Sequence, residues 1–442
     1  MEGRRSILMV TDFFYPNYGG VENHVHTLAQ CLLTQGHKVV VMTHAYSDRT
    51  GVRYMHSGLK VYYIPRLPFY NQNSVPTLFG ACSLLRTVLV RESVDIIHGH
   101  QAFSVLCHEA ILHGRTLGYP CVFTDHSLFG FQDSSSVHTN KLLRFTLCDI
   151  QAVICVSHTS KENTVLRAGL EPDRVFVIPN AVDTAVFTPD PSQRTPGVVT
   201  IAVVSRLVYR KGIDLLVEVI PEICARFPAV RWLVGGDGPK RGVLEQMRSA
   251  HGLEGRVTML GAVAPKDVRS VLVQADVFLN CSLTEAFCIA LLEAASCGLK
   301  VVSTAVGGVP EVLPPEMITL APPEVDAIVA AVSSAIDRPA PDANQQHQAV
   351  TQMYNWHDVT RRTAKVYEFA MRAAGRTHST QRLARLLCAG RFGGLLFCCV
   401  AAVDWILLAF LKAWRPDSAI QKALDLPPYK FGPRSPPAAS TD

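Results

Sequence analysis

Short apolar runs alternate with amphipathic segments along the first 180 or so residues of the chain. This alternation is typical of βα units that build a parallel sheet. We expect strands at 6–12, 38–43, 60–64, 94–98, 120–124, 152–156 and 175–178, and helices near 20–35, 77–92, 101–117, 139–148 and 157–168. Residues 1–182 are therefore predicted to form a first doubly wound, Rossmann-like α/β domain.

A second series of the same kind follows a Pro- and Thr-rich stretch at 183–197, which is predicted to be a linker. Residues 198–354 are predicted to form a second Rossmann-like domain, and an amphipathic helix at 355–376 is expected to cross back to the first. Ligands of doubly wound domains bind at the carboxyl ends of the strands, so we expect the site in a central cleft between the domains. The strands expected in the second domain are 198–204, 230–235, 256–260, 276–280 and 300–303.

One apolar segment near the C-terminus has a different character. Residues 393–411 are mostly apolar and about long enough to cross a hydrocarbon core, which predicts a transmembrane helix at 393–412. Arg382 precedes it and Arg415 follows it, as interfacial anchors would. Asp404 interrupts the run, so a buried globular helix is the alternative. If the helix spans, Asp404 should face a protein partner rather than lipid. Residues 413–442 form a short Pro-rich tail.

Composition narrows the class of protein. A net charge of +5 spread over 442 residues argues against a dedicated nucleic-acid binder. The 13 cysteines lack the Cys-x-x-Cys spacing of zinc or redox sites, which favours reduced thiols facing the cytosol. The apolar run at 6–10 is too short for a signal-peptide core. We therefore expect a single-pass protein with cytoplasmic domains and a lumenal tail.

Two acidic residues stand in an apolar helical pattern at 282–298. Glu285 follows an expected strand end and would open the helix that carries Glu293. A carboxylate in so apolar a helix is costly without a partner. The backbone amides of 286–288, at the expected helix start, would suit phosphate oxygens. A capping Glu285 and a solvated Glu293 are the alternative interpretation.

Two cations follow the first expected strand of the second domain. Arg206 and Lys211 lie in the run 203–212, where they could neutralise a departing diphosphate. A basic loop at a strand end is also common on solvated surfaces. This signal therefore gains weight only beside the two glutamates.

The first domain contributes a glycine-containing loop and a histidine. Gly20 lies in the loop 15–24, directly after the first strand, where a missing side chain lets backbone approach a ligand. The loop lacks the Gly-x-Gly-x-x-Gly dinucleotide fingerprint. His126 follows the strand 120–124 and should face the same cleft, although a single histidine is more often structural.

Together these motifs resemble family 4 of the retaining glycosyltransferases. The runs 12–16, 124–131, 157–167, 205–212 and 284–288 are similar to the catalytic subunits of phosphatidylinositol N-acetylglucosaminyltransferases, which begin glycosylphosphatidylinositol (GPI) anchor synthesis. The resemblance covers about residues 6 to 420. It implies a GT-B fold, with UDP-N-acetylglucosamine as donor, phosphatidylinositol as acceptor and retention of configuration. It also implies accessory membrane subunits, the endoplasmic reticulum membrane, and no metal or other cofactor.

The resemblance also assigns roles to individual residues. Glu285 and His126 are implied to act beside the transferred sugar, and Glu293 to bind the donor ribose. The acceptor is expected near the first domain. The remaining implied donor-binding residues are Gly20, Arg206, Lys211, Phe287, Cys288 and Ile289, and the implied acceptor-binding residues are Tyr18, Asn23 and His24.

Two other functions stay open at this point. The chain could be a catalytically silent sugar-nucleotide-binding scaffold within a membrane complex. The presence of both glutamates, both cations and the glycine loop disfavours that interpretation. A soluble starch- or sucrose-type glycosyltransferase of the same fold is disfavoured by the apolar segment 393–411.

Overall fold

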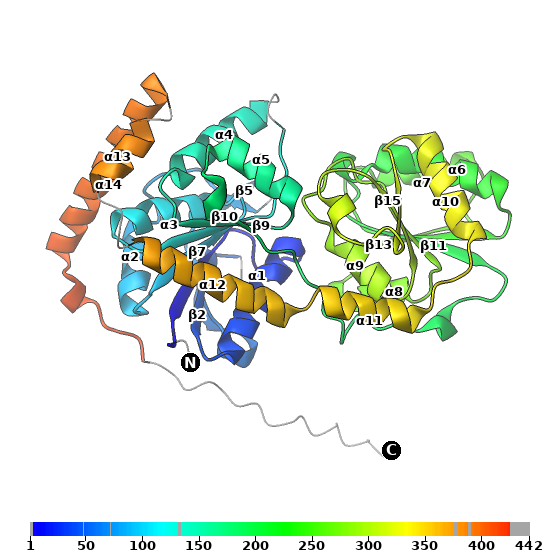
Figure 1. Cartoon of the computed structure of the whole chain (residues 1–442), viewed down its shortest axis with the longest axis horizontal. Helices are drawn as coiled ribbons and strands as arrows, with labels where there is room; N and C mark the ends of the chain where they lie inside the picture. The colour runs from blue at the N-terminus through cyan, green and yellow to red at the C-terminus, as the bar shows by residue number, and fades with distance from the viewer. Residues whose placement is uncertain are drawn as a thin grey trace, which may run out of the picture.

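Two parallel β-sheets with flanking helices lie side by side in the computed structural model (Figure 1). The structure describes residues 3–46, 48–70, 72–130, 134–374, 379–387 and 390–424, so most of the expected tail lies outside it. This architecture confirms the predicted α/β class. We call the part built on the first sheet the N-terminal unit and the part built on the second the C-terminal unit.

The first sheet has the strand order β10-β9-β8-β7-β1-β2-β4-β3 and is parallel except for β3, which runs antiparallel to β4. A small hairpin of β5 and β6 follows β4. The strands are β1 (Ser6–Val10), β2 (Lys38–His44), β3 (Gly51–Tyr54), β4 (Lys60–Ile64), β5 (Pro68–Tyr70), β6 (Asn73–Ser74), β7 (Ile96–His100), β8 (Cys121–Asp125), β9 (Ala152–Cys155) and β10 (Val175–Val177).

The second sheet is parallel throughout, with the order β13-β12-β11-β14-β15-β16. Its strands are β11 (Val199–Val204), β12 (Val230–Gly235), β13 (Val257–Gly261), β14 (Val277–Asn280), β15 (Lys300–Thr304) and β16 (Ile318–Ala321). The helices of the chain are α1 (Gly20–Thr34), α2 (Cys82–Arg91), α3 (Val105–Thr116), α4 (Ser134–Leu147), α5 (His158–Ala168), α6 (Ile213–Arg226), α7 (Arg241–Ala250), α8 (Val268–Leu272), α9 (Ile289–Ser296), α10 (Val325–Asp337), α11 (Ala343–Met353), α12 (Trp356–Ala374), α13 (Ser379–Leu387) and α14 (Arg391–Trp414).

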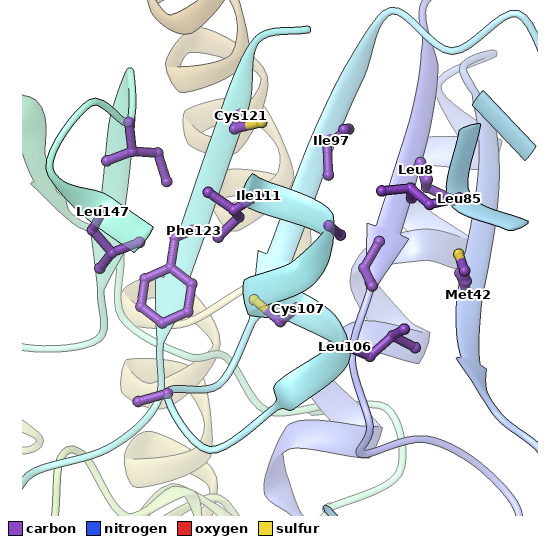
Figure 2. Packing of buried hydrophobic residues seen from close by; sticks show 14 of the residues in the cluster. Leu8, Met42, Leu85, Ile97, Leu106, Cys107, Ile111, Cys121, Phe123 and Leu147 are labelled. Atoms are coloured by element: carbon purple, nitrogen blue, oxygen red, sulfur yellow. The ribbon is translucent and has the colours of Figure 1, made fainter. Parts of the chain in front are cut away.

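Each sheet is buried on both faces, which explains why its strands are nearly continuous apolar runs. In β1, Leu8 and Val10 point into one hydrophobic core, whereas Ile7 and Met9 point into the other. Figure 2 shows the first of these cores, where α3 lies over the sheet and Ile111 meets Phe123 and Ile97. Because side chains alternate along a strand, successive residues of β1 pack against helices on opposite faces of the sheet.

Three parts of the fold differ from the sequence prediction. Strand β7 ends at His100 rather than at residue 98, because the buried histidines of that strand disguise it as a polar segment. The edge strands β3 and β16 were not expected, since β3 is exposed throughout and shows no apolar run. Helix α11 forms within residues 323–353, where the sequence predicts one terminal helix followed by a loop with several prolines. The Asp342 side chain caps α11 by accepting from Asn344 N.

Helix α12 packs across the first sheet, although it follows the second sheet in sequence (Figure 1). Val366 and Ala370 join the same core as Ile7 and Met9. The Tyr367 hydroxyl lies 2.7 Å from Nδ1 of His98, a buried residue of β7. The chain therefore passes between the two units twice, once between β10 and β11 and once between α11 and α12.

Helix α14 lies against the N-terminal unit at its far edge, away from the C-terminal unit (Figure 1). Phe392–Trp414 is the one helix in the described residues that is long and apolar enough to cross a membrane. Asp404 Oδ1 lies 2.6 Å from His113 Nδ1 on α3, and the Thr116 hydroxyl donates to the other carboxylate oxygen. Burial lowers the pKa of His113, but Asp404 and Glu109 raise it above its ordinary value. Asp404 thus has its polar partner within the chain.

The C-terminal end of α14 is also held by α2. The Arg86 guanidinium donates to the carbonyls of Leu411, at 3.2 Å, and Arg415, at 2.8 Å. Beyond the helix, Ala423 N donates to the Arg91 carbonyl at 2.8 Å. The opposite side of α14 carries exposed apolar side chains, among them Leu396 and Ile406.

A glycine fixes the loop that carries Lys211 against the end of β14. Gly212 has a φ of 67°, in the left-handed region that favours glycine. A Cβ at this position would lie 1.7 Å from the carbonyl oxygen of Cys281. No side chain fits there without moving the backbone of one of the two loops.

We expect Gly212→Ala to lower the free energy of unfolding by roughly 2–4 kcal/mol, because it adds a left-handed backbone penalty to a steric clash. Chemical denaturation of the purified protein would measure this. The matched control is Gly242→Ala in α7, where no atom lies within 4 Å of the added Cβ. That change should be neutral or stabilising, and an equal loss in both variants would contradict the role of Gly212.

Candidate active site

The carboxyl edges of the two sheets are in direct contact through their loops. The Ser157 hydroxyl, just after β9, donates to the Ala286 carbonyl at 2.7 Å. The Glu311 carboxylate accepts from the amides of His158, at 2.6 Å, and Thr159, at 2.8 Å, at the start of α5. The loop after β9 therefore meets the loops after β14 and β15. The predicted site residues come from the loops after β1, β8, β11 and β14 and from the helices that follow them.

Lys211 and Glu285 form an ion pair between the loops that follow β11 and β14. The Ser282 hydroxyl also donates to Glu285 Oε1, at 2.8 Å. Burial lowers the pKa of Lys211, but the adjacent Glu285 carboxylate raises it above its ordinary value. The ammonium group therefore stays charged in a partly buried position, where a cation interacts strongly with an anion.

The predicted start of the helix after β14 is wrong. Helix α9 begins at Ile289, and Glu285 lies four residues upstream in an irregular segment. The physical reason is competition for carbonyl groups: Gly308 N donates to the Glu285 carbonyl at 3.0 Å, and Ser157 takes that of Ala286. Cys288, with a φ of 74°, precedes the first helical turn.

The segment 287–289 leads into the first turn of α9. The Phe287 side chain is buried, with its ring centroid 5.8 Å from that of Tyr354. It can therefore offer only backbone to a ligand. The first-turn amides of any helix lack partners within the helix, so Ile289 now marks the end of α9 at which an anion would be favoured.

Glu293 lies on α9, beyond Cys288, and is partly buried. Its carboxylate has no hydrogen-bond partner within the part of the chain that the structure describes. Burial raises the pKa of Glu293 to about 7. A desolvated carboxylate of this kind is ready to accept hydrogen bonds from ligand hydroxyls.

Three imidazoles meet at the carboxyl edge of the first sheet. His126 follows β8, His100 ends β7 and His24 lies in α1. His100 Nδ1 lies 3.3 Å from His126 Nε2, and the ring centroids of His24 and His126 are 4.7 Å apart. Burial lowers the pKa of His24 to about 4 and holds the pKa values of His100 and His126 well below the ordinary range. All three rings are therefore neutral near pH 7.

The remaining predicted residues surround the start of α1. Gly20 is the first residue of that helix, and Tyr18 and Asn23 are exposed beside it. Arg206 is exposed on the opposite unit, and its charge acts on the buried Glu22 carboxylate. The two clusters thus contain Lys211 with Glu285 and His24 with His126, whereas Tyr18 and Asn23 lie at the periphery.

The sequence prediction missed three residues of these clusters, namely Glu22, His100 and Ser282. Position alone could have suggested His100, because it ends a strand next to β8 in the same sheet. Glu22 stands two residues after the second glycine of the loop 15–24, and Ser282 stands three residues before Glu285. None of the three belongs to a spacing pattern that identifies it in a single sequence.

Two groups of described side chains have a geometry that could hold a metal ion. Ligand atoms of His24, His100 and His126 lie within 4.8 Å of one another, as do those of Cys82, His113 and Asp404. The first group belongs to the candidate site, and the second lies under α14. The expectation of a metal-free reaction remains a prediction.

Comparisons with known proteins agree with this arrangement. Residues 44–133 match the family described as PIGA (GPI anchor biosynthesis), and residues 189–355 match Glycosyl transferases group 1. Solved structures of similar fold include sucrose-phosphate synthase from Thermosynechococcus elongatus, with TM-score 0.70 and 20% identity over 84% of this chain and all of that one. Anabaena HepE in complex with UDP has TM-score 0.66 and 19% identity over 82% of this chain and 99% of its own. The fold is GT-B, as predicted.

Two curated relatives are much more similar in sequence, and both are named as subunits of a phosphatidylinositol N-acetylglucosaminyltransferase. The one from Arabidopsis thaliana is 57% identical over 421 residues, covering 95% of this chain and 94% of the relative. The one from Homo sapiens is 52% identical over 427 residues, covering 95% of this chain and 87% of the relative. The chain is therefore a glycosyltransferase that belongs to the PIGA family of phosphatidylinositol N-acetylglucosaminyltransferases.

Proposed function

We propose that this chain transfers N-acetylglucosamine from UDP-N-acetylglucosamine to phosphatidylinositol, with retention of configuration, as the first step of GPI anchor synthesis. The name of its relatives supplies the sugar and the lipid. The observation that carries the proposal is the charged Lys211–Glu285 pair with Arg206 nearby in sequence, facing three neutral imidazoles on the other unit.

The donor diphosphate binds between the units in this proposal. Arg206 and Lys211 neutralise the negative charge that grows on the diphosphate as it leaves, which is the service a metal ion gives in other transferases. No metal or other cofactor is required. The backbone of Gly20 and of Phe287, Cys288 and Ile289 approaches the phosphates and the sugar.

The two glutamates bind the two sugar rings of the donor in this proposal. Glu293 accepts hydrogen bonds from the ribose hydroxyls, which gives its unpartnered carboxylate the partners it lacks. Glu285 binds hydroxyls of the transferred sugar, with Lys211 holding its carboxylate in place. These contacts raise the rate only to the extent that they tighten as the anomeric carbon becomes electron-poor.

The acceptor lipid approaches from the N-terminal unit, past Tyr18, Asn23 and His24. Its inositol hydroxyl attacks the anomeric carbon from the face that the diphosphate leaves. The bond from that carbon to the diphosphate oxygen breaks as the bond to the inositol oxygen forms, and the proton of the attacking hydroxyl passes to the departing diphosphate oxygen. His126 lies beside the reacting carbon as a neutral imidazole, able to donate or accept one hydrogen bond without adding a charge.

The apolar helix α14 gives the chain a membrane attachment, and the word subunit in the name of the relatives implies partner chains. We propose the endoplasmic reticulum membrane, with cytoplasmic domains and accessory membrane subunits. A lumenal tail, as the sequence predicts, requires all contacts of α2 with the end of α14 and the tail to open when α14 crosses the bilayer. They include the contacts of α2 with Leu411, Arg415, Asp417 and Ala423.

A catalytically silent scaffold is the alternative. It would bind UDP-N-acetylglucosamine and yet give no lipid product in the assay described next. The pairing of Lys211 with Glu285 disfavours it, because a partly buried ion pair contributes little to stability and is costly to keep without a use.

The first test is transfer of radiolabelled N-acetylglucosamine to phosphatidylinositol by membranes that contain the assembled complex, with identification of the lipid product and its anomeric configuration. We expect Arg206→Ala to reduce turnover about 10²–10³-fold, as loss of one preorganised charge does. The control is Lys266→Ala, which removes a different exposed cation of the C-terminal unit. Normal turnover by Arg206→Ala, with equal assembly, would refute the role of this cation.

The raised pKa of Glu293 predicts a pH-dependent donor affinity. Ribose hydroxyls donate to the ionised carboxylate, so donor binding favours the deprotonated form. Because the pKa of the free protein is about 7, affinity should fall roughly tenfold from pH 8 to pH 6 and level off above pH 8. Equilibrium binding of UDP-N-acetylglucosamine would measure this. Glu293→Gln should bind weakly and show no pH dependence over that range, and a variant that keeps the full dependence would exclude Glu293 as its source.

The exposed apolar side of α14 predicts that this helix attaches the chain to the membrane. Replacing Leu396 and Ile406, each 61% exposed, with Glu should release the chain from membranes in carbonate extraction, because charges there are costly in hydrocarbon. The contact of Asp404 with α3 stays intact in this variant. Leu166→Glu, at a residue 63% exposed on α5, is the control and should remain membrane-bound. Retention of the α14 variant would mean that other contacts attach the chain.

A further inference from the structure

An apolar cavity of about 180 Å³ lies in the N-terminal unit, between the segment that follows β6, helix α3 and helix α4. Leu78 and Val105 line it, together with Leu112 and Leu142. None of these residues takes part in the two clusters described above. Cavities of similar size with apolar walls stay dry and bind small hydrocarbons.

The polar groups in the cavity wall are already satisfied by the protein. His108 Nδ1 lies 2.9 Å from the Thr146 hydroxyl, and its Nε2 lies 2.8 Å from the Ala102 carbonyl. Glu109 accepts from Ala81 N at 2.6 Å and from Thr77. Burial lowers the pKa of His108 to about 4, so the ring is neutral. The cavity therefore offers mainly apolar surface, which favours an apolar occupant.

The same wall is continuous with the docking surface of α14. Leu112 and Leu142 belong both to the cavity and to the apolar cluster in which Ala401 of α14 is buried. The Phe145 ring, on α4, stacks on Phe397 of α14 with the centroids 4.5 Å apart. The cavity thus lies beside the one described helix that is apolar enough to enter a membrane.

The cavity wall is also connected to the candidate active site through the loop that follows β7. Val105 is the first residue of α3, which begins at the carboxyl edge of the first sheet. His108 holds the Ala102 carbonyl, one residue after Gln101, and the Gln101 side chain accepts from the Ser127 hydroxyl next to His126. The segment 101–104, between β7 and α3, therefore connects His100 of the imidazole cluster with Val105 of the cavity wall.

We propose that this cavity binds part of one acyl chain of the acceptor phospholipid while its head group lies at the imidazole cluster. The inference rests on the proposed function and adds an acyl-binding subsite to it. An acyl chain held there contributes to the binding of the acceptor. It also keeps the head group at the carboxyl edge of the first sheet. It also explains why α14 packs on α3 and α4 rather than standing free of the unit.

Filling the cavity should impair the use of a diacyl acceptor only. Leu78→Trp and Val105→Phe should each raise the KM for phosphatidylinositol about tenfold, the equivalent of about two methylene groups no longer buried. The KM for glycerophosphoinositol, which has the same head group and no acyl chains, should not change. Leu320→Trp in β16 is the matched control, because Leu320 is 38% exposed and Leu78 is 39% exposed. All variants would be assayed in the assembled membrane complex with radiolabelled donor.

A second measurement locates the chain directly. Phosphatidylinositol with a diazirine in mid-chain should label peptides of α3 or α4 after irradiation, and Leu78→Trp should suppress that labelling. Labelling without any KM change would assign the cavity to a neighbouring lipid and overturn the acceptor part of the proposal. An equal KM rise for both acceptors, or no labelling, would overturn it entirely. Failure of the unaltered complex to glycosylate either acceptor would instead refute the proposed function.

Discussion

The ion pair between Lys211 and Glu285 joins the two loops on which the C-terminal half of the site depends. Each loop follows a central strand of the second sheet. The first contains one 3-10 turn, Tyr209–Lys211, and the second has no regular structure before α9. Gly212 lets the first loop touch the backbone of Cys281, and the carbonyl of Glu285 is held by Gly308. The charge pair thus rests on backbone contacts, so its geometry is set before any ligand arrives. Preorganised charge of this kind is the most effective form of electrostatic catalysis.

The two units differ in the groups that they bring to the site, which are charged in one and neutral in the other. The C-terminal unit presents fixed charges at Arg206, Lys211 and Glu285. The N-terminal unit presents three imidazoles that burial keeps neutral. In the proposed reaction, these neutral imidazoles would not compete with the cations for the diphosphate. They would also leave hydrogen bonds for hydroxyl groups, as a polyol acceptor requires.

The sequence predicted the fold class, the two series of strands and the apolar C-terminal helix, because these depend on the periodicity of apolar residues. It also predicted that Glu285 and Lys211 are site residues, and the structure brings them together. It placed the start of α9 wrongly, since the carbonyls that would begin that helix are taken by Ser157 and Gly308, partners distant in sequence. His100 escaped notice for a related reason. A histidine in a buried strand has meaning only once its neighbours in the sheet are known.

The two passages of the chain between the units have a mechanical consequence. A single connection would let the units swing in any direction, whereas two connections side by side leave mainly one rotation, about the line that joins them. The second passage leads into α12, whose Tyr367 hydroxyl contacts His98 in the strand that ends at His100. A rotation of one unit relative to the other would therefore act on α12 and, through Tyr367, on the strand that carries His100. The polypeptide that leaves the C-terminal unit thus returns to complete the core of the N-terminal unit.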